Sequence, residues 1–115
     1  MGIDFSKCNA FLFSVSFENC HLDYCSFFQL KMKKTSFLNC SIRDVDFAET
    51  DLSMSLFNNC DLLNTSFMRS ILEKTDFRTA TNYSFDPEQN KIKKAKFSLP
   101  GVIGLLSKYP IDIEN

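Results

Sequence analysis

The chain has 115 residues, 44% of them hydrophobic, and its 13 basic and 14 acidic side chains give a formal net charge of −1. This length predicts one domain, and so small a net charge provides no overall field that would attract nucleic acid or an anionic membrane. No apolar stretch approaches the roughly 20 residues that span a bilayer, and no charged-then-apolar leader opens the chain, so we expect a cytoplasmic protein.

Residues 1–11 fit poorly into the repeat that follows them. Phe5 lies seven residues before Leu12, where a regular five-residue spacing begins, so the register slips by two. Nothing in this segment resembles a cap for the end of a repeat structure. We therefore expect the N-terminal end to be covered by a second copy in a homodimer, or to have been preceded by further repeats of a longer protein.

Large apolar residues recur at every fifth position over residues 10–79, and no helical or strand period fits this spacing. The residue two positions earlier is nearly always small, and the remaining positions are mostly polar. Such a unit cannot bury its apolar side alone, so the units must coil and stack. The spacing predicts core columns built from Leu12, Phe17, Leu22, Phe27, Met32, Phe37, Ile42, Phe47, Leu52, Phe57, Leu62, Phe67, Leu72 and Phe77.

A longer period of twenty residues lies inside this repeat. Phe alternates with an aliphatic residue at the large position, and the segments 16–20, 36–40 and 56–60 resemble one another. Twenty residues correspond to four five-residue units per coil. Two opposed Phe columns and two aliphatic columns would then fill the cross-section of each layer.

The five-residue units resemble those of a known family. Val45-Asp46-Phe47-Ala48-Glu49 and Thr50-Asp51-Leu52-Ser53-Met54 are similar to the repeat of the pentapeptide-repeat proteins. The resemblance covers residues 10–79 and implies an all-β fold, the right-handed quadrilateral β-helix. It specifies a fold and no activity.

After Phe77 the pattern is interrupted and then returns. Residues 80–89 contain turn-forming residues where large ones are expected, which predicts a loop with Tyr83 and Phe85 turned inward. Ile92 and Phe97 fall twenty residues after Leu72 and Phe77. We therefore expect a resumed coil over residues 90–97, with Ile92 and Phe97 on the core columns.

The last predicted element is a short capping α-helix over residues 98–109. Ser98 is a typical N-cap, Pro100 is tolerated in the first turn and Pro110 would stop the helix. The predicted apolar face of the helix would cover the end of the column, and it consists of Leu99, Val102, Ile103, Leu106 and Tyr109. The single domain would thus extend over residues 1–109 and be followed by a tail, residues 110–115.

Two kinds of surface are candidates for binding. An outward column of Phe28, Ala48 and Met68 favours a protein interface, and the other candidate interface residues are Phe5, Phe11 and Phe13. Lysines gather around the side that contains Leu12 and Ile92, either as a solvated set that protects strand edges or as a site for an anionic partner. This second set consists of Lys31, Lys33, Lys34, Lys74, Lys91, Lys93, Lys94 and Lys96.

Residues that could support chemistry are better explained by structural roles. Cys20, Cys40 and Cys60 occupy the small inward position, where free cysteine behaves as a small core residue. His21 and the pair Asp44 and Asp46 lie on outward positions of flat sides, without an aligned nucleophile. We therefore expect no catalytic, cofactor or metal site.

The sequence favours a non-catalytic scaffold that binds another protein or its own copy through flat β-faces or its N-terminal end. The family resemblance also implies an alternative, the quinolone-resistance branch, whose members imitate duplex DNA and bind DNA gyrase. That branch shows a strongly acidic face and dimerises tail to tail. The net charge of −1 and the lysine-rich side argue against it, and the inward position of the aromatic residues argues against nucleic-acid binding.

Overall fold

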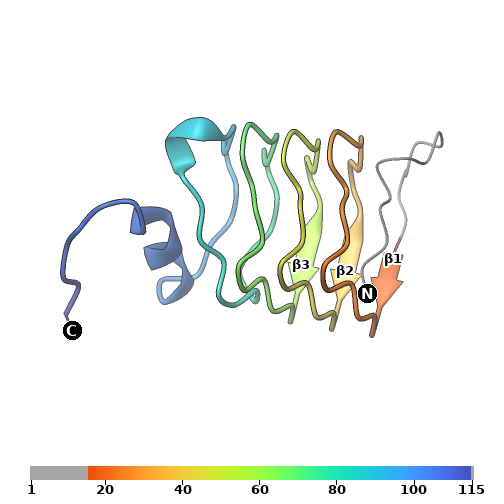
Figure 1. Cartoon of the computed structure of the whole chain (residues 1–115), viewed down its shortest axis with the longest axis horizontal. Helices are drawn as coiled ribbons and strands as arrows, with labels where there is room; N and C mark the ends of the chain where they lie inside the picture. Colours follow the sequence, from red (N-terminus) through yellow and green to blue (C-terminus); the bar gives the residue numbers. More distant parts are fainter. Residues whose placement is uncertain (1–15, 115) are drawn as a thin grey trace.

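The computed structural model describes residues 16–114, and residues 16–97 form a four-sided, right-handed β-helix (Figure 1). Strands β1 (Ser16–Glu18), β2 (Ser36–Leu38) and β3 (Leu56–Asn58) make a parallel sheet in that order along one side. The register joins Phe17 to Phe37 and Phe37 to Phe57. Isolated parallel bridges on the other sides pair residues at the same separation, for example Lys31 with Asp51, so each coil takes four five-residue units.

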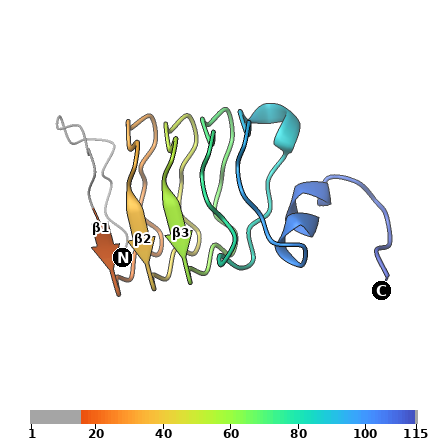
Figure 2. The same ribbon diagram turned by 180° about the vertical axis from the view of Figure 1, so that it is seen from behind.

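The four sides are numbered here by the large residues that point inward from them. These residues are Phe17, Phe37, Phe57, Phe77 and Phe97 on the first side; Leu22, Ile42 and Leu62 on the second; Phe27, Phe47 and Phe67 on the third; and Met32, Leu52, Leu72 and Ile92 on the fourth. Leu12 lies outside the described residues. Figure 2 shows the same stack of coils from behind.

The core is a double stack of phenylalanine rings. Phe37 and Phe57 are nearly parallel, with ring centroids 4.8 Å apart, because each coil lies directly over its neighbour. Across the axis, Phe37 meets Phe47 edge to face at 5.8 Å. Both arrangements are favourable for aromatic pairs. These three rings are fully buried, whereas Phe17, Ile92 and Phe97 near the ends are partly buried.

The corners of the coils are left-handed turns made without glycine. Fourteen non-glycine residues between Asn19 and Lys94 have φ between 53° and 65°. This conformation costs roughly 1 kcal/mol or more for a residue with a side chain. Hydrogen bonds between coils offset the cost, as when the Lys34 amide donates to the Ser53 carbonyl at 2.9 Å and the Asn39 amide to that of Asn58 at 2.9 Å.

The small inward positions carry a second set of hydrogen bonds between coils. The hydroxyls of Thr50 and Thr75 donate to the carbonyls of Phe27 and Leu52, both at 2.8 Å. The thiol of Cys60 donates in the same way to the Phe37 carbonyl at 3.3 Å. Ser, Thr and Cys are thus suited to this position, because a short side chain with a donor satisfies a buried carbonyl.

The segment after Phe77 departs from the regular coil where turn formers replace large residues. Tyr83 and Phe85 are buried, and their rings contact that of Phe77 at 5.3 and 5.7 Å. A single 3-10 turn follows, η2 (Pro87–Gln89), whose preceding Asp86 accepts from the Glu88 amide at 2.9 Å. The coil then resumes, and Phe97 stacks on Phe77 at 5.4 Å.

The α-helix expected over residues 98–109 is not present. Its place is taken by a shorter 3-10 helix, η3 (Gly101–Leu106). The N-cap is Pro100 instead of the expected Ser98, whose hydroxyl nevertheless accepts from the Gly101 amide at 3.1 Å. Gly104 lies so close to Tyr83 that an added Cβ would come within 2.0 Å of the Tyr83 carbonyl oxygen. This close contact requires glycine at position 104. Because glycine has a low α-helix propensity, the same requirement disfavours the expected α-helix.

The prediction of which residues of this segment face the core is also wrong. With three residues per turn, Val102 and Leu105 fall on one line, and these are the two that pack against the core. The other four residues of the predicted face are exposed, namely Leu99, Ile103, Leu106 and Tyr109. The helix covers the end of the column with a narrower surface than the sequence suggested.

Candidate interaction surfaces

The residues considered for chemistry lie where structural roles explain them. Cys25, Cys40 and Cys60 are buried, and burial raises the pKa of the Cys60 thiol to about 11. His21 is exposed on the second side. Across residues 16–114, no three His, Cys, Asp or Glu side chains are grouped so that they could hold a metal ion.

Asp46 and the asparagine column are held in local hydrogen bonds. Asp46 accepts from the Ala48 amide at 2.8 Å, while Asp44 is exposed at a left-handed corner. The Asn59 side chain donates to that of Asn39 at 3.3 Å, which links two coils. The structure thus brings no acid–base pair together at these positions.

The predicted interface column on the third side is only partly open to solvent. Phe28 and Ala48 are half-buried, and Met68 is 44% exposed. Phe5, Phe11 and Phe13 lie outside the described residues, as does the segment on which the expected N-terminal association depends. In the part of the chain that the structure covers, no helix is long and apolar enough to cross a membrane.

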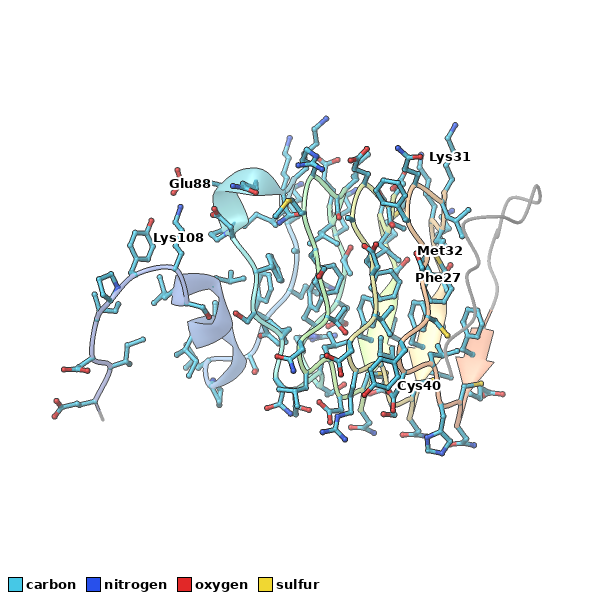
Figure 3. All side chains as sticks on the ribbon, viewed as in Figure 1. Phe27, Lys31, Met32, Cys40, Glu88 and Lys108 are labelled. Carbon is cyan, nitrogen blue, oxygen red and sulfur yellow. The ribbon has the colours of Figure 1, made fainter. Side chains whose placement is uncertain are left out.

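The fourth side is the lysine side, and Figure 3 shows Lys31 pointing away from it while Met32 points inward. Seven lysines and two acids lie on this side, and Lys96 follows just around the corner. Lys33 lies 3.9 Å from Asp51, but no ion pair within residues 16–114 involves the cluster at the last two coils. This cluster consists of Lys74, Lys91, Lys93, Lys94 and Lys96, all exposed.

On the other sides the arginines neutralise carboxylates. Arg69 pairs with Glu49 at 2.9 Å and Arg78 with Asp76 at 2.9 Å, and Arg43 lies 3.6 Å from Asp61. Hydrogen bonds from Arg69 and Arg78 hold the pKa values of Glu49 and Asp76 below their ordinary values. Each of these three arginines thus has a carboxylate partner, unlike the lysines of the cluster.

A C-terminal apolar surface lies beyond the end of the column. It consists of the exposed side chains of Leu99, Ile103, Leu106, Tyr109, Ile111 and Ile113. No charged residue occurs from Phe97 to Ser107. Exposed apolar residues are ordinary when scattered, but six within fifteen positions are a concentration that favours an interface.

The last coil has an open edge on the fourth side, residues 90–94. In the coil before it, the amides of Leu72 and Lys74 donate to the carbonyls of Lys91 and Lys93 at 2.7 and 3.0 Å. Within residues 16–114, the corresponding amides of Ile92 and Lys94 donate to no acceptor. The Asn90 carbonyl likewise accepts from no donor in these residues. A groove of about 690 Å³ adjoins this edge, between residues 69–71 and 88–91.

The family profile described as "Pentapeptide repeat region" matches residues 3–84, which is most of the chain. The chain belongs to the pentapeptide-repeat family. A search of curated proteins found none that matches this pentapeptide-repeat protein.

A solved structure of another pentapeptide-repeat protein has the same fold. HetL, a pentapeptide-repeat protein involved in heterocyst differentiation regulation in the cyanobacterium Nostoc sp. strain PCC 7120, aligns with a TM-score of 0.74 and 14% identity, over 84% of this chain and 46% of HetL. The chain thus spans about half the length of HetL. Trypsin-treated QnrB1 (R167E), a plasmid-mediated fluoroquinolone resistance protein, aligns at 0.49 with 16% identity, over 97% of this chain and 72% of QnrB1.

Sequence reasoning misses two features of this pentapeptide-repeat protein. An α-helical period places Leu99, Ile103 and Leu106 on one inward face, so the pattern assigns the C-terminal apolar surface to the core. The residues around the open edge show no sequence pattern from which the unpaired backbone groups could be predicted. A usable signal does exist in the tail, where Ile111 and Ile113 alternate with acidic residues as in a strand with one buried face.

Proposed function

We propose that this pentapeptide-repeat protein is a non-catalytic binding module that associates with a second copy through its C-terminal apolar surface. The observation that carries the proposal is the exposure of this surface, with Leu99 88% accessible and Ile103 51%. The flat sides, in contrast, expose mainly polar and charged residues.

A second copy is the occupant that the chemistry of this surface favours. The surface is apolar and uncharged from Phe97 to Ser107, so two identical patches can meet around a twofold axis without repulsion. Charged residues flank the segment from Phe97 to Ser107, at Lys96 and Lys108, and alternate with isoleucine in the tail. An apolar centre with a polar rim is the usual composition of a protein interface.

The gyrase-binding alternative receives less support from the charges. A mimic of duplex DNA needs a continuous negative surface, and here Arg43, Arg69 and Arg78 neutralise carboxylates on three sides. The fourth side is basic. Failure to inhibit DNA supercoiling by gyrase would be consistent with the binding module and would remove the alternative.

The proposal is tested by sedimentation of the purified chain over a range of concentrations. We expect a reversible dimer for the unchanged protein and a monomer for Ile103→Lys. Met68→Lys is the matched control, because it places the same charge at a residue of similar exposure on the third side. A monomer at every concentration, or a dimer that survives Ile103→Lys and is lost with Met68→Lys, would overturn the assignment.

A further inference from the structure

The open edge at residues 90–94 has the hydrogen-bonding pattern of an incomplete parallel sheet. Between two coils of the fourth side, one amide donates backward, from Lys91 to the Ser70 carbonyl at 3.0 Å, and two donate forward, from Leu72 and Lys74. The last coil repeats this arrangement with the Asn90 carbonyl and the amides of Ile92 and Lys94. Unpaired groups in this order are a template for one more strand.

Helix η3 closes a different part of the last coil. The Phe85 amide donates to the Gly104 carbonyl at 3.2 Å, and Gly101 and Gly104 pack against Tyr83. No hydrogen bond from the described part of the chain reaches the Asn90 carbonyl or the amides of Ile92 and Lys94. Ile92 is only half-buried at the top of its column, so apolar area also remains to be covered there.

The tail has the sequence that such an edge would select. Ile111 and Ile113 are 55% and 54% exposed and alternate with Asp112 and Glu114. In a strand, this alternation directs aliphatic side chains to one face and carboxylates to the other. The edge offers the complement, with Ile92 pointing inward and Lys91 and Lys93 pointing outward.

The tail of each chain leads away from its own open edge. Lys108 forms ion pairs with Asp86, at 3.1 Å, and with Glu88, which it approaches in Figure 3. The Ile111 amide then donates to the Tyr109 carbonyl at 2.9 Å, which makes a tight turn at Pro110. In Figures 1 and 2 the tail beyond this turn extends away from the column.

We propose that residues 111–114 of one copy add as a parallel strand to the open edge of a second copy. This inference rests on the proposed self-association, which brings the two C-terminal ends together. The Asp112 amide donates to the partner copy's Asn90 carbonyl, and the carbonyls of Asp112 and Glu114 accept from the amides of Ile92 and Lys94. Ile113 then stacks on Ile92, and the two carboxylates lie beside Lys91 and Lys93.

Proline determines this register. If Ile111 were the residue stacked on Ile92, Pro110 would have to donate to the Asn90 carbonyl, and proline has no amide hydrogen. If Asp112 were stacked on Ile92, a carboxylate would enter the apolar column. Only the register with Ile113 inward satisfies both the hydrogen bonds and the side chains.

The experiment uses two single-cysteine additions in the full chain, Lys91→Cys and Asp112→Cys, mixed and treated with a short bifunctional thiol reagent. We expect a covalent dimer that joins position 91 of one chain to position 112 of the other, identified by mass spectrometry. Each variant alone and the unchanged chain are the controls, and they should give at least tenfold less of this product. A third variant carries both substitutions in one chain. If its cross-link between positions 91 and 112 formed only within a single chain, the strand would belong to the same copy, and the proposal would be overturned.

Charge reversal provides a second readout. Asp112→Lys with Glu114→Lys should weaken the dimer about three- to tenfold at low salt, since each exposed ion pair contributes little. Mixing this variant with Lys91→Glu, Lys93→Glu should restore affinity, which a merely structural role of either segment would not do. A dimer that forms normally but gives neither the cross-link nor the rescue would overturn strand addition while leaving self-association intact. A chain that never dimerises would overturn the proposed function itself.

Discussion

The Sγ atom of Cys60 lies 3.3 Å from the carbonyl oxygen of Phe37, one coil away, and donates a hydrogen bond to it. Cys40 makes the equivalent contact with the Phe17 carbonyl at 3.2 Å. The thiols are therefore part of the contacts between coils and are shielded from solvent. Their arrangement as a column reflects the twenty-residue coil and requires no redox role.

The first prediction concerns the reactivity of Cys60. Burial raises the pKa of its thiol to about 11, from a reference value of 9.0, so at pH 8 the thiolate fraction is about a hundredfold lower than in an unfolded chain. We expect alkylation of the folded protein to leave Cys60 unmodified while the same residue reacts rapidly in denaturant. Peptide mass spectrometry over time measures both rates. Equal rates with an intact circular dichroism spectrum would contradict the assignment.

The second prediction concerns the phenylalanine stack. Phe47 is fully buried between Phe27 and Phe67, at centroid distances of 5.0 and 5.4 Å. Phe47→Asp should abolish cooperative unfolding, because no partner is available for a carboxylate in the column. Phe47→Leu should retain the fold and lower the free energy of unfolding by about 1–2 kcal/mol. His21→Ala and Lys33→Ala, both at the surface, should change it by less than about 0.5 kcal/mol.

The third prediction concerns the left-handed corners. Met54 has φ 59°, a strained backbone conformation, and its side chain is 43% exposed. Little burial of apolar area therefore offsets the strain. Met54→Gly should raise the free energy of unfolding by a few tenths to about 1 kcal/mol. Ser66→Gly is the control at an exposed position outside the left-handed set, where glycine should lower stability. Chemical denaturation of the three proteins compares the values, and a loss at Met54 would refute the strain argument.

The fourth prediction concerns acid stability. Arg78 holds the pKa of Asp76 below its ordinary value, so the pair stabilises the fold above about pH 4, and this contribution is lost as the pH falls through the lower folded pKa. Arg78→Gln should therefore be less stable than the unchanged protein at pH 6, and the difference should disappear once the pH lies below the folded pKa of Asp76. Denaturation across this pH range tests the difference. Lys34→Gln, which removes an exposed cation from the lysine side, should leave the pH profile unchanged.

The sequence alone was sufficient to predict the stacked coils, but it did not predict the structure that follows the last coil. Phe37, Phe47 and Phe57 could be assigned to stacked coils because a five-residue period in one register is compatible with few folds, and the family match agrees with the β-helix. Residues 98–109 have no period to guide them. There Gly104 is selected by its contact with the Tyr83 backbone, a tertiary constraint that local propensity cannot reveal. The same limit hid the open edge, since an unpaired amide depends on the absence of a neighbour.

The twenty-residue separation between residues paired in register has a consequence for how this molecule can lengthen or shorten. Deleting or duplicating one complete circuit, such as 36–55, removes or adds a storey and leaves the remaining walls in place. An indel that is not a multiple of five turns polar groups toward the axis, and an indel of five, ten or fifteen residues moves the later residues onto another wall. Growth of such a chain therefore proceeds in whole storeys.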